Sequence, residues 1–145
     1  MGRWWLDGFV YLAGAYGNDP EGNTRRAVEY AKELVARHVP VFCPHSHSLG
    51  WEKWGCPLST FLQVDFAFVN TCKALFVLPL GKSDGVVAEV LQATKLHKPV
   101  YNITSHPAML DHDKEFVRFL KDTEQSRADY MAEVASAYEA LLSVR

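Results

Sequence analysis

Residues 74–103 read ALFVLPLGKSDGVVAEVLQATKLHKPVYNI, and this stretch decides the fold class. Its first five residues are continuously apolar, as expected of a strand that is buried on both faces. Paired apolar residues then predict a helix over 86–96, and 99–103 has the pattern of a further strand. A strand, a helix and a second strand at short spacing form a βαβ unit, so the sequence predicts a parallel sheet.

The same alternation continues toward the N-terminus. Strands are predicted at Phe9–Ala13 and Val39–Cys43, with a helix after the polar residues 17–23 and another over Leu58–Cys72. We therefore expect one α/β domain over residues 1–145, with a sheet of roughly four or five strands covered by helices on both faces.

Two helical segments are predicted to close the chain, at about 111–122 and 127–142. The second carries an apolar stripe that must be buried somewhere. It packs either on its own sheet or against a second copy of the chain, so a homo-oligomer, a dimer or a tetramer, is expected.

Composition excludes several classes of partner. The net charge is -2, and the Lys and Arg residues are scattered, so no nucleic acid polymer is expected to bind. No run of about 18 apolar residues occurs, which argues against a membrane partner. The three cysteines are odd in number and follow no signal peptide, which favours a cytoplasmic location.

Ligands of parallel sheets bind beyond the carboxyl ends of the strands, so the loop after residue 78 is informative. There Ser83 and Gly85 precede the predicted helix. Ser83 is a good N-cap, Gly85 allows close approach of a ligand, and the free N–H groups of a helix start bind anions. The alternative is an ordinary cap without a ligand.

Two carboxyl groups and a phenol are the candidate catalytic groups. Glu89 lies early on the helix after Ser83, between apolar positions, where a favourable interaction with the helix dipole is the alternative explanation. Asp65 shares a helix face with apolar side chains, so it either has a structural donor or faces a pocket. With Tyr11 on the first strand, these groups could supply a nucleophile, a general acid and an orienting hydroxyl. That set suits cleavage of a glycosidic bond.

The segment 44–57 is predicted to be a long loop and therefore a functional one. It contains His45, which we expect in a polar pocket wall. The alternatives are ordinary loop content and, more weakly supported, a zinc site with the neighbouring cysteines, whose spacing matches no common signature. Trp51 and Trp54 either stack on a base or cover the sheet edge.

In order and spacing, Tyr11-Leu12-Ala13-Gly14, Asp65, Ser83-x-Gly85-x-x-x-Glu89 and Lys98-Pro99-Val100 resemble the nucleoside 2-deoxyribosyltransferase-like superfamily, which includes the 2'-deoxynucleoside 5'-phosphate N-hydrolases. The two Trp residues and the closing helices are more similar to a bacterial branch of that superfamily than to either enzyme. The resemblance implies a flavodoxin-like fold, no cofactor, and active sites completed by a neighbouring subunit. It also implies that Glu89 acts at the sugar C1', that Asp65 handles the proton on the leaving base and that Tyr11 positions Glu89.

The resemblance further implies the substrate. Ser83 stands where the transferases carry Asp, which favours a 5'-phosphate, and His45 aligns with a pocket histidine of the hydrolases. The phosphate-binding Arg of the hydrolases is missing after the first strand, and Arg25 or Arg26 is the candidate replacement. We place Gly14 with Ser83, Gly85, His45 and Trp51 among the substrate-binding residues.

Three functional hypotheses follow. The first is an N-glycosidase that releases the base of a nucleoside 5'-monophosphate. The second is transfer of the deoxyribosyl group between bases, and the third is a nucleotide-binding module without catalysis, which would tolerate loss of Glu89. None of them requires a metal or a redox cofactor.

Overall fold

The structure is a computed structural model, and it describes residues 8–81, 83–102, 136 and 139. Within these residues one parallel sheet contains four strands: β1 (Val10–Ala13), β2 (Val41–Phe42), β3 (Ala74–Val77) and β4 (Val100–Asn102). Their order across the sheet is β2-β1-β3-β4. The predicted α/β class and the parallel sheet are confirmed.

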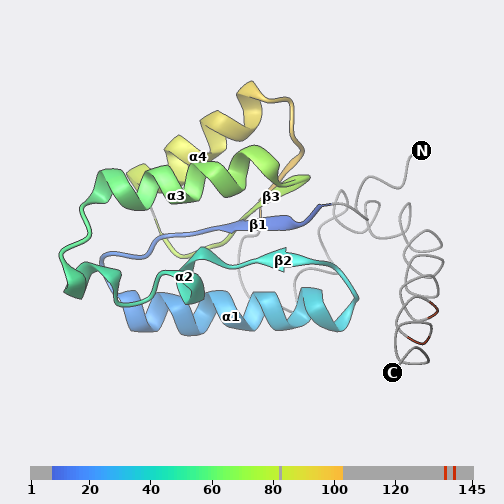
Figure 1. Ribbon diagram of the computed structural model, residues 1–145, viewed down its shortest axis with the longest axis horizontal. Coiled ribbons are helices and arrows are strands. Elements are labelled where there is room, and N and C mark those ends of the chain that lie inside the picture. The colour runs from blue at the N-terminus through green and yellow to red at the C-terminus, as the bar shows by residue number, and fades with distance from the viewer. Residues whose placement is uncertain (1–7, 82, 103–135, 137–138, 140–145) are drawn as a thin grey trace.

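Helices cover both faces of this sheet. Figure 1 shows α1 (Pro20–Ala36) on one side of the strands, and α3 (Leu58–Thr71) and α4 (Asp84–Lys95) on the other. The result is a flavodoxin-like arrangement of three layers. None of the helices in the described part of the chain combines the length and the apolar character that crossing a bilayer requires.

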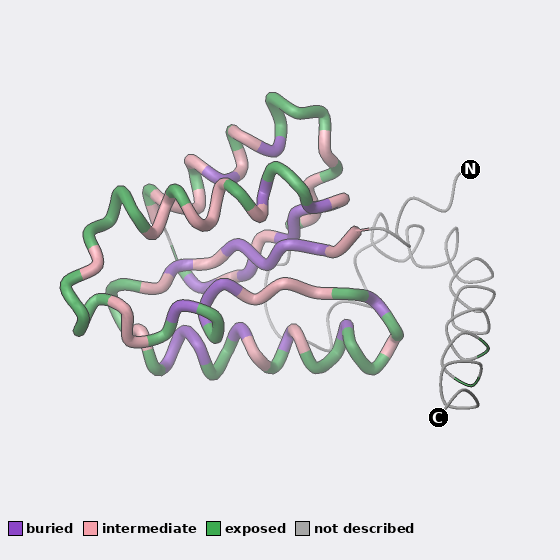
Figure 2. The backbone as a smooth tube through the Cα atoms, in the orientation of Figure 1, coloured by how far each residue is buried: buried purple, intermediate pink, exposed green. Residues whose placement is uncertain are grey.

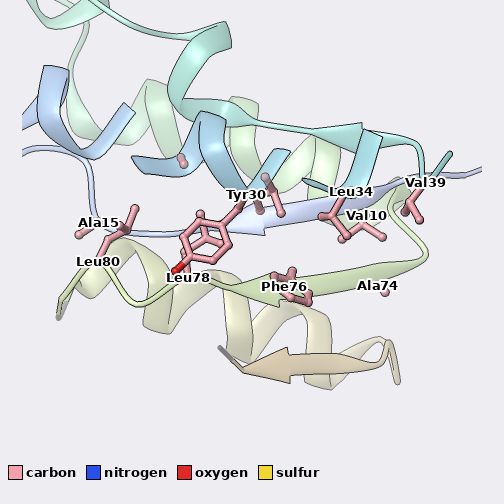
Figure 3. Close-up of a cluster of buried hydrophobic side chains, with 11 residues drawn as sticks. Val10, Ala15, Tyr30, Leu34, Val39, Ala74, Phe76, Leu78 and Leu80 are labelled. Carbon is pink, nitrogen blue, oxygen red and sulfur yellow. The ribbon is translucent and has the colours of Figure 1, made fainter. Parts of the chain in front are cut away.

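The two central strands, β1 and β3, are apolar because both of their faces are buried, as Figure 2 shows. Successive side chains point to opposite faces, so β1 contributes Val10 and Leu12 to the cluster under α1, and Tyr11 and Ala13 to the cluster under α3 and α4. Figure 3 shows the first cluster, in which Tyr30 and Leu34 of α1 lie over the sheet. The second face carries the candidate functional side chain of Tyr11.

Both helices that follow the central strands begin with a capping side chain. Asp19 Oδ1 accepts a hydrogen bond of 3.2 Å from Gly22 N, and Pro20 occupies the first turn of α1. A Cβ on Gly22 would lie 2.1 Å from Asp19 Oδ2, so only glycine fits beside this cap. Because of these contacts α1 begins at Pro20, inside the polar segment 17–23, whereas the sequence pattern predicts a helix that begins after this segment.

Residues 44–57 do not form a continuous loop, so that prediction is wrong. Pro44 begins a short helix, α2 (Pro44–His47), and a 3-10 helix, η2, spans Trp51–Trp54. Gly50 and Gly55 flank η2 with φ angles of 87° and 80°, which glycine adopts without strain.

The second strand is shorter than predicted. The amide of Val39 bonds to the carbonyl of Leu34 (3.0 Å) at the end of α1, and the carbonyl of Cys43 accepts from the amide of His47 (3.2 Å). The backbone at both ends of the predicted strand is therefore hydrogen-bonded to the adjoining helices, α1 and α2. Of the two predicted closing helices, only Ser136 and Glu139 are described, and both are helical and exposed. The rest of those two predictions lies outside the described residues.

Candidate active site

One cavity of about 350 Å³ opens at the carboxyl ends of the central strands β1 and β3. The chain leaves β1 toward β2 on one side and β3 toward β4 on the other, so this is the topological switch point of the sheet. Most of the predicted site residues line the cavity: Gly14, His45, Asp65, Ser83, Gly85 and Glu89.

Tyr11 is buried next to the cavity and is not part of its wall. It is 0% exposed, and its ring packs 5.9 Å from that of Phe42. Within the described residues, Tyr11 Oη and Glu89 Oε2 are both buried without a hydrogen-bond partner. The hydroxyl is nevertheless close enough to Glu89 and Asp65 to favour the charged form of each carboxyl. The three groups thus form one cluster from β1, α3 and α4, in which Tyr11 and Glu89 are buried and Asp65 is half-buried.

Burial sets the protonation of this cluster. Desolvation raises the pKa of Glu89 to about 8, the Tyr11 hydroxyl opposes that rise, and the charge of Asp65 adds to it. Desolvation also raises the pKa of Asp65 to about 6, again opposed by Tyr11. Burial, followed by the negative charges of Glu89 and Asp65, raises the pKa of Tyr11 far above its usual value, so its hydroxyl keeps its proton. Because these pKa values lie on either side of neutrality, the two carboxyl groups together hold about one proton near pH 7.

The start of α4 forms the adjoining wall. Ser83 Oγ accepts a hydrogen bond of 3.4 Å from Val86 N, as predicted for an N-cap, and its own hydroxyl hydrogen remains able to donate. A Cβ on Gly85 would lie 3.5 Å from Ser83 Oγ and 3.9 Å from Glu89 Oε1. Because Gly85 has no side chain, the space between the Ser83 hydroxyl and the Glu89 carboxyl group stays open.

His45 is a buried part of the wall with a defined tautomer. It is 2% exposed, and its Nε2 lies 3.0 Å from the carbonyl oxygen of Ala15. Because a carbonyl only accepts, Nε2 carries the hydrogen, and burial lowers the pKa of His45 so that the ring is neutral. A Cβ on Gly14 would lie 3.3 Å from His45 Cε1 and 2.8 Å from Leu80 Cδ1. Glycine at this position lets the imidazole pack against the end of β1.

Sequence reasoning missed several wall residues, above all Tyr16, Glu52 and Phe61. Tyr16 Oη donates a hydrogen bond of 2.8 Å to Glu52 Oε2 and accepts one of 3.0 Å from Gly50 N. Phe61 is one of the apolar side chains that share a helix face with Asp65 in the sequence pattern. No local pattern connects Tyr16 with Glu52, because the contact depends on how the segment after α2 folds back.

The predicted base-stacking residue, Trp51, is not among the residues that line the cavity. Its ring lies 6.0 Å from that of Phe61 and 5.3 Å from that of His47, so it supports the aromatic wall. Trp54 is 78% exposed and stacks on Trp51 at 6.3 Å.

Two cationic side chains that were candidates for phosphate binding lie elsewhere. Arg25 and Arg26 line a separate depression beside α1, and Arg26 Nη2 donates to Asn23 Oδ1. Within the described residues, the wall of the main cavity contains no Lys or Arg. Among those same residues no group of three or more His, Cys, Asp or Glu side chains is arranged to hold a metal ion.

No protein-family model and no curated protein sequence matches this chain.

Proposed function

We propose that this cavity cleaves the N-glycosidic bond between the base and the sugar of a nucleoside 5'-monophosphate. The observation that supports this most strongly is the pair of buried Glu89 and half-buried Asp65, whose pKa values lie on either side of neutrality and which border a single cavity. Paired carboxyl groups whose pKa values are pushed apart are the usual machinery for this type of bond cleavage. The motif resemblance favours the same chemistry.

In the proposed reaction Glu89 acts on the sugar and Asp65 acts on the base. The Glu89 carboxylate attacks or stabilises C1' as positive charge develops there, while the C1'–N bond breaks and its electron pair goes to the base. Asp65 donates a proton to that base; water then attacks C1', gives a proton to the Asp65 carboxylate and frees Glu89. The buried Tyr11 hydroxyl orients the Glu89 carboxylate.

The proton must lie on Asp65 for this reaction, whereas in the empty cavity the higher pKa belongs to Glu89. A sugar that develops positive charge beside Glu89 favours the charged form of that carboxyl and so lowers its pKa. The positive charge that develops at C1' in the transition state therefore favours an ionised Glu89 with the proton on Asp65, which is the arrangement that both roles require.

The pH dependence of turnover tests this assignment. Activity requires one proton on the pair, so kcat/KM should follow a bell with an acid limb near pH 6 and an alkaline limb near pH 8. Below the first limb both groups are protonated and no carboxylate is available; above the second both are charged and no acid remains. Asp65→Asn should leave a single limb that rises with pH. A flat profile between pH 5 and 9 would remove the pair from the mechanism.

The 5'-phosphate is proposed to bind at the start of α4. There the Ser83 hydroxyl and the free amides of the first turn can donate several charge-assisted hydrogen bonds. The absence of Lys or Arg from the described cavity wall favours a second candidate, transfer or cleavage on a nucleoside with a free 5'-hydroxyl. The two candidate substrates differ in charge at the 5' position. A monophosphate brings negative charge to the region around Ser83, whereas a nucleoside does not.

Ser83→Asp separates these candidates. The new carboxylate should repel a phosphate by an amount on the order of a few kcal/mol in a partly desolvated pocket, so monophosphate affinity should fall about 100-fold or more. A nucleoside can donate its 5'-hydroxyl to the new carboxylate and should bind as well as before or better. Titration calorimetry with one matched nucleoside and monophosphate pair measures both effects.

Ser59→Asp is the matched control, because Ser59 is an exposed residue in the first turn of α3 and does not line the cavity. This variant should bind both ligands like the parent. If the parent binds nucleoside and monophosphate equally, or if Ser83→Asp loses both equally, the phosphate site at α4 is wrong.

A further inference from the structure

Glu52 is an acidic group in the cavity wall to which the reaction above gives no role. It comes from η2 and is exposed to solvent, so it lies at the opening of the cavity, whereas Glu89 is 5% exposed in its interior. The hydrogen bond from Tyr16, followed by nearby backbone amides and Lys53, lowers the pKa of Glu52. Glu52 therefore presents a negative charge at the opening throughout the neutral range.

Tyr16, which is distant in the sequence, holds the Glu52 carboxylate in position. Gly50 N donates to Tyr16 Oη (3.0 Å), and Tyr16 Oη donates in turn to Glu52 Oε2 (2.8 Å). A carboxylate has two oxygens with about four acceptor sites, so Tyr16 occupies only part of its capacity. The remaining lone pairs of Glu52 can only accept hydrogen bonds, and they are available to a ligand group that reaches the opening of the cavity.

A flat apolar surface adjoins this acceptor. The ring of Phe61 lines the cavity and lies 6.0 Å from the ring of Tyr16. Trp51 packs on Phe61 at 6.0 Å. Aromatic walls of this kind hold planar rings by stacking. Tyr16 contacts both Phe61 and Glu52, so the aromatic wall and the carboxylate acceptor adjoin the same tyrosine at the cavity.

We propose that Glu52 is the specificity-determining residue of this cavity and selects a base with two adjacent donors, the ring N–H and the exocyclic amine of guanine. This inference rests on the proposed function, since it takes the planar ligand to be a nucleobase. Two parallel N–H groups match the two oxygens of a carboxylate. Adenine and cytosine place a ring acceptor beside their amine, and its lone pair repels a carboxylate. Hypoxanthine differs from guanine only in lacking the amine.

The matched ligands are therefore 2'-deoxyguanosine and 2'-deoxyinosine 5'-monophosphate, titrated calorimetrically into the full chain. The parent should bind the guanine nucleotide on the order of tenfold more tightly, as expected for one good carboxylate contact to a base edge. Glu52→Gln has the same size but offers a single acceptor oxygen, so the two affinities should come within about threefold of each other. Tyr16→Phe leaves the carboxylate but removes the hydroxyl that orients it, so the preference should be intermediate.

Glu29→Gln is the control, because Glu29 is an exposed residue of α1 paired with Lys32 and does not line the cavity. It should keep the parent's preference. A parent without preference, an unchanged preference in Glu52→Gln, or an equal loss of both ligands in that variant would overturn the role of Glu52. Base release is measured in parallel: preference without release supports this inference and contradicts the proposed function, and release without preference does the reverse.

Discussion

Glu89→Gln is expected to lower base release by about 10³-fold or more, which corresponds to about 4 kcal/mol of transition-state stabilisation. The amide keeps the size of the side chain and can bond to the Tyr11 hydroxyl, but it carries no negative charge for C1'. The carboxylate acts mainly on the transition state, so ligand binding should change by less than about tenfold, roughly 1.4 kcal/mol. Single-turnover rates and calorimetric dissociation constants, measured on the same preparation, separate the two effects.

The control for this experiment is Glu33→Gln on α1, where the glutamate is exposed and away from the cavity. Its turnover should equal that of the parent. Turnover within tenfold of the parent in Glu89→Gln would remove Glu89 from the chemistry. Loss of binding and turnover together would make it a residue for ligand binding.

The same substitution should stabilise the folded protein, and increasingly so as the pH rises. In the unfolded chain Glu89 ionises near its ordinary pKa of 4.5, and in the folded chain near 8. Below pH 4.5 both states hold the proton, so the stabilisation from the protonated, buried group is complete. Between pH 4.5 and 8 the unfolded state alone loses the proton, which favours unfolding by about 1.4 kcal/mol per pH unit. The contribution is therefore lost as the pH rises through the folded pKa.

Glutamine cannot ionise, so Glu89→Gln avoids this loss. The variant and the parent should have similar unfolding free energies at pH 4.5, and by pH 8 the variant should be the more stable by a few kcal/mol. Urea denaturation at pH 4.5, 6.5 and 8 measures the difference. A difference that does not grow with pH would mean that Glu89 is not buried as a neutral acid.

Much of the fold could be predicted because each element has a local cause. The apolar run at 74–78 requires burial on both faces, and the paired apolar residues after Ser83 require a helix. Parallel strands align their carboxyl ends, so Gly14, Ser83 and Glu89 could be placed at one edge before any coordinates were known. The carboxyl groups were recognisable because a charged residue among apolar neighbours needs a reason.

The opening of the cavity could not be predicted in the same way. Glu52 and Tyr16 meet because Pro44 starts a short helix and two glycines with positive φ angles flank η2. Proline and glycine in segment 44–57 suggested a loop, and the direction in which such a segment turns depends on tertiary contacts. Trp51 was expected either to stack on a base or to cover the sheet edge, whereas its ring packs against Phe61.

The central claim is that this chain breaks a base–sugar bond through Glu89, and chromatographic detection of free base tests it most directly. The parent and Glu89→Gln are incubated with the 2'-deoxynucleoside 5'-monophosphates of the common bases and with the matching nucleosides. We predict free base from at least one monophosphate with the parent, and a loss of about 10³-fold with the variant. Tight binding of these ligands without release of any base, or equal release by both proteins, would contradict the claim.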